Sequence, residues 1–389
     1  MEFSELSVQE FEKFALGAPG ANFMQSREMY ERFLKNGREA YLVGVKSSAG
    51  KSAEAGATSG SRGKVLAAGI LMNMGSKRGL GKIFGIAMGP LMDFSAENWR
   101  EVLAVFTSGM REFLKPKTAF AVQITPHAAV SRRDYENQPL CEVFPEIKPE
   151  LKKLGYKDLG EVGQIKWEYV IDFGKGKARK SLDEIFDGFR KDIRTRIKQA
   201  SERYGVRIRD LEFDELSVMK DMTDEAVAAH NFHDKDLKYY QEMWEAFGDK
   251  VKFVVAEVPK EIAEGKVERL DKMPEGSQLS GEYVPISAVM YMLYGPEVIS
   301  LFSGVTRKYK NVGGCSHLIR WELIKYAYEN GFSRYDFYGV KPVAGNSVYN
   351  FKAGFRGEIE ELVGTHQLPI TALGKAYTLR AKYKEYGVF

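Results

Sequence analysis

The first part of the chain carries apolar stretches of two kinds. Runs rich in β-branched and aromatic residues predict four strands, at residues 40–46, 65–74, 82–88 and 119–124. Apolar positions at helical spacing predict three helices, at residues 7–14, 28–34 and 96–114. Ser7 and Glu10 stand in capping-box spacing at the start of the first helix. The order of these elements predicts an α/β (α+β) fold, since helices must cover a sheet whose central strands are apolar.

The chain beyond residue 160 repeats this kind of order. Strands are expected at residues 167–173, 206–210, 251–258, 286–294 and 298–304. Helices are expected at residues 181–204, 216–230, 236–247 and 316–330. The helix at 181–204 begins with a Ser181/Glu184 capping box. Two such units predict two domains, one formed by residues 1–160 with the tail 360–389 and one formed by residues 161–359.

The stretch from Ser333 to Gly357 is rich in aromatic residues. Their alternation with small or polar residues predicts two strands, at 335–340 and 348–355, and a loop between them that can present groups to a ligand. Lys352 lies in the middle of the second predicted strand. On the pattern alone, this lysine is a solvated side chain on an edge strand.

Residues 47–63 have a different composition from their surroundings. They are mostly Gly, Ala and Ser, which cannot bury a core, so a flexible hairpin loop is expected there. The connection 259–283 is also interrupted, by Gly265, Pro274, Gly276 and Gly281. Such breaks exclude two long helices of many heptads in this connection.

Composition narrows the class of protein. The chain has 389 residues, 44% of them hydrophobic and 28% charged, as in ordinary soluble globular proteins. A net charge of +4 permits an anionic partner without demanding one. Two cysteines cannot form a disulfide framework, and the start has neither a basic segment nor an apolar one of the signal-peptide kind. No apolar run reaches the roughly 20 residues of a membrane span, so a cytoplasmic location is expected.

Several motifs, in a fixed order along nearly the whole chain, resemble the FemABX family of peptidyltransferases. They are Gly89–Asp93, Ser181–Glu184, Lys235–Met243, Tyr309–Asn311, Leu318–Ala327, Tyr335–Val340 and Tyr349–Phe355. The resemblance implies two tandem domains like GCN5-related N-acetyltransferases (GNAT), with mixed sheets flanked by helices. It implies transfer of an amino acid from aminoacyl-tRNA to the side-chain amine of a peptidoglycan precursor stem peptide, in a groove between the domains or along the first. The interrupted connection 259–283 is similar to that of the FemX-like members without a coiled-coil arm.

This reaction needs a cation that stabilises an oxyanion and a group that accepts the proton of the attacking amine. By resemblance, Lys352 with Phe351 beside it takes the first role, at the oxyanion or the acceptor end of tRNA. Some family members place an aspartate where this chain has Thr125, which cannot do carboxylate work. The base therefore stays open between His127, a phosphate of the substrate and water.

The resemblance also implies groups that bind the precursor. Lys235 and Tyr239 match positions that bind the diphosphate, although lysine lacks the bidentate fork of arginine. The other expected substrate-binding residues are Arg32, Lys35, Phe302 and Thr125. In the helix at 181–204, the basic positions Arg190, Arg194 and Lys198 are candidates for contact with tRNA phosphates or an anionic membrane surface, while a solvated helix face is the ordinary explanation of such charges.

Other functions remain open on the sequence. His230 and His233 have a metal-ligand spacing but no third ligand cluster. Residues 311–315 stand where an acetyltransferase would bind the pyrophosphate of acetyl-CoA, without the full glycine pattern. The alternatives are thus an acyltransferase that uses acyl-CoA, and a non-catalytic module that binds tRNA or a membrane surface. No cofactor is expected besides aminoacyl-tRNA as co-substrate, and the location is cytoplasmic, with peripheral association at the inner face of the membrane as an open alternative.

Overall fold

The computed structural model describes residues 1–48, 63–160, 165–174, 176–230, 235–273, 279–309 and 312–380. Most of the expected flexible loop at 47–63 lies outside these residues, as do the side chains of His230 and His233. The described chain forms two compact units. The first contains Met1–Arg132, Cys141–Lys166 and the chain after Glu361, and the second contains Arg133–Leu140 and Trp167–Glu360. The expected division into one domain of residues 1–160 with 360–389 and one of residues 161–359 stays a prediction.

The first unit is built on a mixed sheet in the order β1-β2-β3-β4-β6-β17-β9, with β5 paired to β3. Its strands are β1 (Glu2–Glu5), β2 (Ala40–Lys46), β3 (Val65–Lys77), β4 (Gly81–Ile86), β5 (Leu91–Met92), β6 (Ala119–Ile124), β9 (Lys157–Asp158) and β17 (His366–Pro369). Its helices are α1 (Val8–Gly17), α2 (Arg27–Lys35), α3 (Trp99–Leu114), α4 (Ile147–Lys153) and α12 (Ala372–Arg380).

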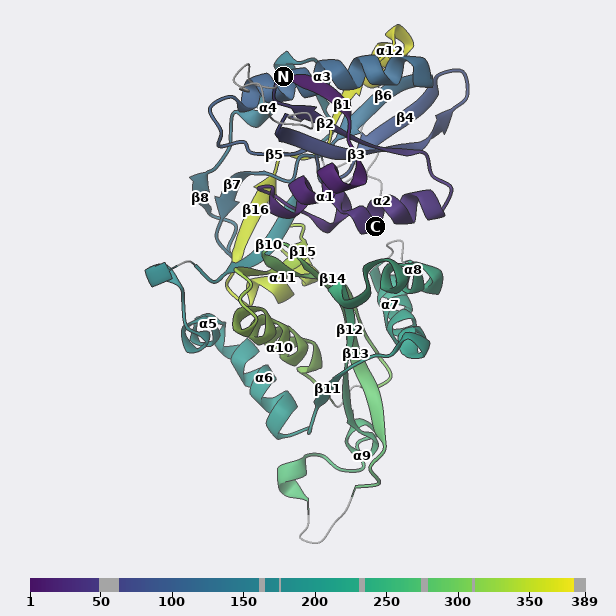
Figure 1. The fold of residues 1–389 in the computed structure, drawn as a ribbon. Helices are drawn as coiled ribbons and strands as arrows, with labels where there is room; N and C mark the ends of the chain where they lie inside the picture. Colours follow the sequence, from purple (N-terminus) through teal and green to yellow (C-terminus); the bar gives the residue numbers. More distant parts are fainter. Residues whose placement is uncertain are drawn as a thin grey trace, which may run out of the picture. The chain divides into compact units, whose positions relative to one another are not determined.

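Helix α3 covers one face of this sheet (Figure 1). Its apolar side buries Leu103, Phe106 and Met110 against Val43 of β2 and Phe84 of β4 in one hydrophobic core. The Ser7/Glu10 capping box at the start of α1 is present, as the sequence predicts. Helix α3 also connects the parallel strands β4 and β6, which makes a βαβ unit inside an otherwise largely antiparallel sheet.

The second sheet has the order β11-β12-β13-β14-β15-β10-β16-β7-β8. Its strands are β7 (Ala129–Arg133), β8 (Pro139–Glu142), β10 (Trp167–Asp172), β11 (Arg207–Asp210), β12 (Val251–Pro259), β13 (Tyr283–Tyr294), β14 (Glu297–Val305), β15 (Arg334–Gly339) and β16 (Glu358–Leu362). The helices of the second unit are α5 (Leu182–Gly188), α6 (Lys191–Glu202), α7 (Leu216–His230), α8 (Leu237–Phe247), α9 (Lys260–Ala263), α10 (Cys315–Glu329) and α11 (Ser347–Ala353). Here α10 connects the parallel strands β14 and β15, so the second unit repeats the βαβ arrangement of the first.

The single helix expected at 181–204 is wrong, because the chain breaks into α5 and α6. The Ser181/Glu184 capping box starts α5 as predicted, but Gly188 ends it and Phe189 is extended, with ψ 152°. The apolar residues spaced by four remain buried in the core of the second unit: Ile185, Phe189, Ile193 and Ile197. Helix α6 lies beside α10 (Figure 1).

The strand expected at 348–355 is also wrong, because residues 347–353 form helix α11. Asn346 caps this helix, its side-chain oxygen accepting a hydrogen bond from the Tyr349 amide at 2.9 Å. Tyr349 and Lys352, one turn apart, are its buried residues, so the aromatic alternation in the sequence fits a helix face as well.

The connection between β12 and β13 contains no long helix in its described part. It holds the single-turn helix α9 and a 3₁₀ turn at Leu270–Lys272. The prediction of a chain without a coiled-coil arm is confirmed for these residues. None of the helices that the structure describes is both long and apolar enough to cross a bilayer.

Candidate active site

The parallel strands of the second unit separate along their length. Strands β14 and β15 pair at Val298 with Tyr335 and at Ile299 with Asp336, and the register ends there, although β14 continues to Val305. In the first unit the parallel strands β4 and β6 stay paired to their ends. The separation leaves backbone polar groups at the end of β15 that need other partners.

Lys352 supplies these partners from α11. Its ammonium group donates hydrogen bonds to the carbonyl oxygens of Phe337 at 2.8 Å, Tyr338 at 3.1 Å and Gly339. Successive carbonyls of an extended strand point to opposite sides. Tyr338 has φ +64°, which leaves the extended conformation and allows three successive carbonyls to meet one cation. All three N–H groups of the ammonium are therefore engaged.

The surroundings of Lys352 are buried and charged. The side chain is 8% exposed, and burial lowers its pKa to about 7, while the Asp336 carboxylate acts in the opposite direction and Arg320 adds to the decrease. Burial and the neighbouring Glu168 raise the pKa of Asp336 well above its ordinary value. Buried ionisable groups whose pKa values are shifted in this way by burial and by charged neighbours are common in catalytic sites.

A half-buried arginine, Arg334, fixes the start of β15 next to this group. Arg334 contacts Glu297 of β14 at 2.6 Å and Glu360 of β16 at 2.9 Å. Both carboxylates raise the pKa of Arg334. Arg334 therefore links β15 to its neighbour β14 and, across β10, to β16, close to the point where β14 and β15 separate.

Phe351 precedes Lys352 on α11 and lies against α10. Its ring centroid is 4.8 Å from that of His317 and 5.5 Å from that of Phe355. Burial, together with the cationic Arg196, lowers the pKa of His317 to about 4. His317 is therefore neutral at physiological pH and packs as an aromatic ring.

Three of the expected substrate-binding residues lie together in the second unit. The Lys235 ammonium is 5.2 Å from the centroid of the Tyr239 ring, which in turn lies 5.8 Å from the Phe302 ring. Tyr239 is also close enough to Tyr338 to affect its pKa, which burial raises well above the ordinary value. Tyr239 thus lies near the end of β15 that Lys352 holds, and Lys235 and Phe302 lie beside Tyr239.

The other expected binding residues lie in the first unit. Thr125 is buried, and its hydroxyl is 3.2 Å from that of Thr365. His127 lies two residues further, its Nδ1 donating to the Gly20 carbonyl at 3.1 Å. Arg32 and Lys35 occupy the last turn of α2.

The basic side chains that are candidates for tRNA contact are partly engaged in contacts within the second unit. Arg190 precedes α6 and makes a bidentate pair with Asp192, at 2.5 and 2.9 Å. Arg194 donates to the Asp187 carbonyl. Lys198 is exposed on α6. Two of the three cations are therefore already engaged within the second unit.

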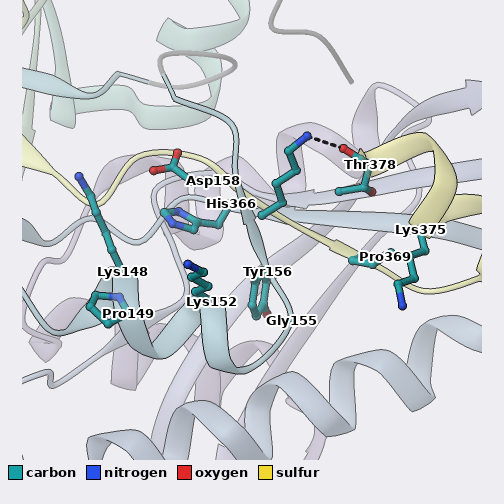
Figure 2. Close-up of a pocket in the computed structure, with 11 residues that line it drawn as sticks. Lys148, Pro149, Lys152, Gly155, Tyr156, Asp158, His366, Pro369, Lys375 and Thr378 are labelled. Carbon is teal, nitrogen blue, oxygen red and sulfur yellow. Dashed lines mark hydrogen bonds between the residues drawn. The ribbon is translucent and has the colours of Figure 1, made fainter. Parts of the chain in front are cut away.

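A further pocket lies in the first unit and was not anticipated from the sequence (Figure 2). It has a volume of about 820 Å³ and lies between α4, β9, β17 and α12. Its polar wall consists of Lys148, Lys152, Lys157, Lys375, Asp158 and His366. His366 is buried and its Nδ1 donates to the Gly364 carbonyl at 3.2 Å, so Nε2 of the neutral ring remains an acceptor. Four lysines around one hollow make it attractive to anions.

Sequence reasoning missed the buried charged residues beside Lys352. Arg320 stands three and four residues before Leu323 and Ile324, which marks it as a member of the buried face of α10. Asp336 interrupts an apolar strand between Tyr335 and Phe337. A charge inside an apolar pattern is the signal that could have identified both residues.

Comparison with known proteins adds to this geometry. The FemAB family profile matches residues 6–264 and 260–382. Aminoacyltransferase FemA of Staphylococcus aureus (strain bovine RF122 / ET3-1) is 25% identical over 440 aligned positions, which cover 99% of each chain. FemA of strain MW2 matches to the same extent.

Two solved structures show the same fold. FemX superimposes with a TM-score of 0.73 at 17% identity, covering 98% of this chain and all of that one. A tandem GNAT protein from the clavulanic acid biosynthesis pathway superimposes with a TM-score of 0.51 at 10% identity, covering 95% and 98%. The predicted fold class, two tandem GNAT-like domains with mixed sheets, is confirmed.

Proposed function

Because this chain belongs to the FemAB family, we propose that it transfers an amino acid from aminoacyl-tRNA to the side-chain amine of a peptidoglycan precursor stem peptide and so builds the interpeptide bridge. The observation that carries this proposal is the family match along nearly the entire chain, together with the FemX-like fold. The acceptor is the nucleotide-linked or the lipid-linked precursor. With the lipid-linked form, the protein would work at the inner face of the membrane.

The reaction exchanges one acyl bond for another. The precursor amine attacks the ester carbonyl of aminoacyl-tRNA, an amide bond forms, the ester bond breaks, and the terminal ribose hydroxyl leaves with a proton. Negative charge develops on the carbonyl oxygen in the transition state, so a fixed positive charge nearby accelerates the step. The protonated form of Lys352 supplies such a charge from a rigid position, because three carbonyls hold its ammonium group.

The cluster of Lys235, Tyr239 and Phe302 combines the kinds of side chain that can bind the precursor. A cation beside the rings of Tyr239 and Phe302 can bind a phosphate while the rings contact an apolar or planar part of the ligand. We expect Lys235→Ala to weaken precursor binding by about 1–3 kcal/mol, the range of charge-assisted hydrogen bonds. Lys238→Ala, on the exposed side of α8, is the matched control. Isothermal titration measures both, and an unchanged dissociation constant in Lys235→Ala contradicts this placement.

The lysine pocket of the first unit, with Arg32 and Lys35 elsewhere in that unit, offers further phosphate contacts to either polyanionic substrate. We expect the double change of Lys152 and Lys375 to alanine to reduce the salt dependence of tRNA or precursor binding. Lys153→Ala is the control, since Lys153 pairs with Glu150 and does not line the pocket. Equal salt slopes for the two variants would remove the pocket from substrate binding.

A transfer assay tests the function itself. Purified protein is mixed with a pool of charged tRNAs and with either nucleotide-linked or lipid-linked precursor, and the extended stem peptide is detected by mass spectrometry. Melting temperature with acetyl-CoA tests the acyl-CoA alternative, since a ligand that binds the folded state raises it. Stabilisation by acetyl-CoA, with no product from charged tRNA, would overturn the proposal.

A further inference from the structure

Arg320 is an arginine in a place where the fold gives it no counterion. It lies on α10, whose neighbouring residues Ile319, Leu323 and Ile324 are buried in the core of the second unit, and it is itself 6% exposed. Its Nε and Nη1 atoms are buried and have no hydrogen-bond partner among the described residues. No described carboxylate lies within ion-pair distance of its guanidinium.

A buried arginine without a counterion destabilises the folded state. A buried charge is tolerated when a partner of opposite charge compensates its loss of hydration. Arg334, in the same unit, meets this condition through Glu297 and Glu360. Arg320 does not, and burial accordingly lowers its pKa. The same unit thus contains one arginine with two carboxylate partners and one with none among the described residues.

Two buried hydroxyls lie near Arg320. A hydrogen bond with Ser300 and the charge of Arg320 both oppose the rise that burial causes in the pKa of Tyr335, so the three side chains lie close together. Ser300 is the residue at which β14 leaves its pairing with β15. Arg320 also lowers the pKa of Lys352, which places the Lys352 ammonium nearby.

His317 lies one turn before Arg320 on the same face of α10, and its Nδ1 is buried without a partner. Water could satisfy hydrogen bonds at such a place, but it cannot balance the charge of a guanidinium. A ligand oxyanion would do both, since its oxygens accept from the guanidinium and from the one hydroxyl hydrogen that the Tyr335–Ser300 pair leaves free.

We propose that Arg320, with Tyr335 and Ser300, forms a buried binding site for one oxyanion, the carboxylate or phosphate group of a ligand that enters where β14 and β15 separate. The site is additional to the Lys352 ammonium, which is occupied by backbone carbonyls, and to the cluster around Lys235. The inference depends on the contacts of this unit and holds whether or not the proposed transfer reaction is correct.

Replacing the arginine tests the cost of its burial. We expect Arg320→Met to raise the melting temperature of the ligand-free protein by at least about 2 °C, because an uncompensated charge is removed while the volume is kept. Arg334→Met is the matched control and should lower it, because Glu297 and Glu360 would lose their partner. A lower melting temperature for Arg320→Met would overturn the proposal, since the arginine would then be satisfied within the fold.

Anion titration tests the ligand class. Inorganic phosphate and sodium acetate, each compared with sodium chloride at equal ionic strength, should raise the melting temperature of the wild type and leave Arg320→Met unchanged. Acetate active alone identifies a carboxylate, and phosphate active alone identifies a phosphate. Equal shifts in wild type and variant would show that the anions act elsewhere and would refute the site.

A measurement on the wild type avoids dependence on variant folding. The positive charge of Arg320 lowers the pKa of His317, so an anion bound to Arg320 should raise that pKa. The His317 ring signals can be followed by NMR from pH 7 to pH 4, with and without saturating phosphate, which keeps a negative charge over this range. An unchanged His317 titration with phosphate, at a concentration that stabilises the protein, would place the anion away from Arg320.

Discussion

At Lys352, a single cation serves three carbonyls, so its side chain matters to the fold as well as to any chemistry. Lys352→Met keeps most of the volume but leaves the carbonyls of residues 337–339 without donors, at about 1–3 kcal/mol for each buried group. The methionine variant also avoids the loss of hydration of a buried charge, which offsets part of this destabilisation. We expect a net decrease of about 2–4 kcal/mol in the free energy of unfolding, measured in urea, together with loss of transfer.

Lys352→Arg separates these two effects. Arginine keeps the charge and several N–H donors, so we expect it to recover stability relative to the methionine variant. If it also recovers transfer, the charge at the end of β15 is what the reaction needs. A Lys352→Met protein with unchanged stability would show that the carbonyls find other partners, which contradicts the role described here.

His317 gives the site a measurable pH dependence. Its pKa is about 4 in the folded protein and about 6.5 when unfolded, because burial, Arg196 and Arg320 oppose its protonation while Asp192 favours it. Between these values the unfolded chain binds more protons, so stability falls as pH decreases from 6.5 to 4. We expect wild type to lose about 3 kcal/mol relative to His317→Phe over this range. Parallel pH profiles of urea unfolding for the two proteins would contradict the prediction.

The residues of the site could be predicted from the sequence only in part. The family motif identified Lys352 and its neighbour Phe351, but the functional roles of both stay predictions. The sequence could not show that Lys352 is engaged by three carbonyls, because this depends on the left-handed Tyr338 and on the separation of β14 from β15. Helical periodicity predicts apolar packing for the buried face of α10, so it does not reveal Arg320, whose charge lies on that face.

At the scale of elements, the start of α10 depends on how closely it approaches α6. Gly314 has φ +88°, and a Cβ atom at this position would lie 2.3 Å from the Arg196 carbonyl oxygen. Gly331, after the other end of α10, has φ +80° with open space around it. We expect Gly331→Ala to cost about 1 kcal/mol through backbone strain, and Gly314→Ala to cost about 2–4 kcal/mol because the helices must also move apart. Urea unfolding of both variants measures this difference. Equal decreases in the free energy of unfolding would mean that α6 can move away from α10 at no energetic cost.

The elements that sequence patterns predicted well are those with long, regular periodicity. Helix α3 and strands such as β2 and β12 lie close to their expected positions. The pattern failed where a local signal opposes it: Gly188 interrupts a helix whose apolar stripe continues unbroken, and Asn346 starts a helix in an aromatic run that alternates like a strand. The strands of two to five residues, such as β5, β9 and β17, are too short to leave a periodic signal.

At the scale of the whole molecule, the order of motifs predicted the family and fold class correctly, because such an order is shared along the entire chain. The boundaries of the domains are less well defined by sequence. Residues 133–140 contact the second unit although they precede the expected boundary at residue 160, since short hairpins such as β7 and β8 carry little apolar signal. Only the contacts of the folded chain assign them.

The two separate hydrophobic cores predict how the molecule unfolds. Leu103 is fully buried in the core of the first unit and Ile319 in that of the second. Replacing either with alanine removes about 2–5 kcal/mol from its own core. If the units are independent domains, calorimetry should show two overlapping transitions, of which Leu103→Ala lowers one and Ile319→Ala lowers the other. A single transition that both changes lower equally would show that the chain unfolds as one cooperative body, and the predicted division into two folding domains would then be wrong.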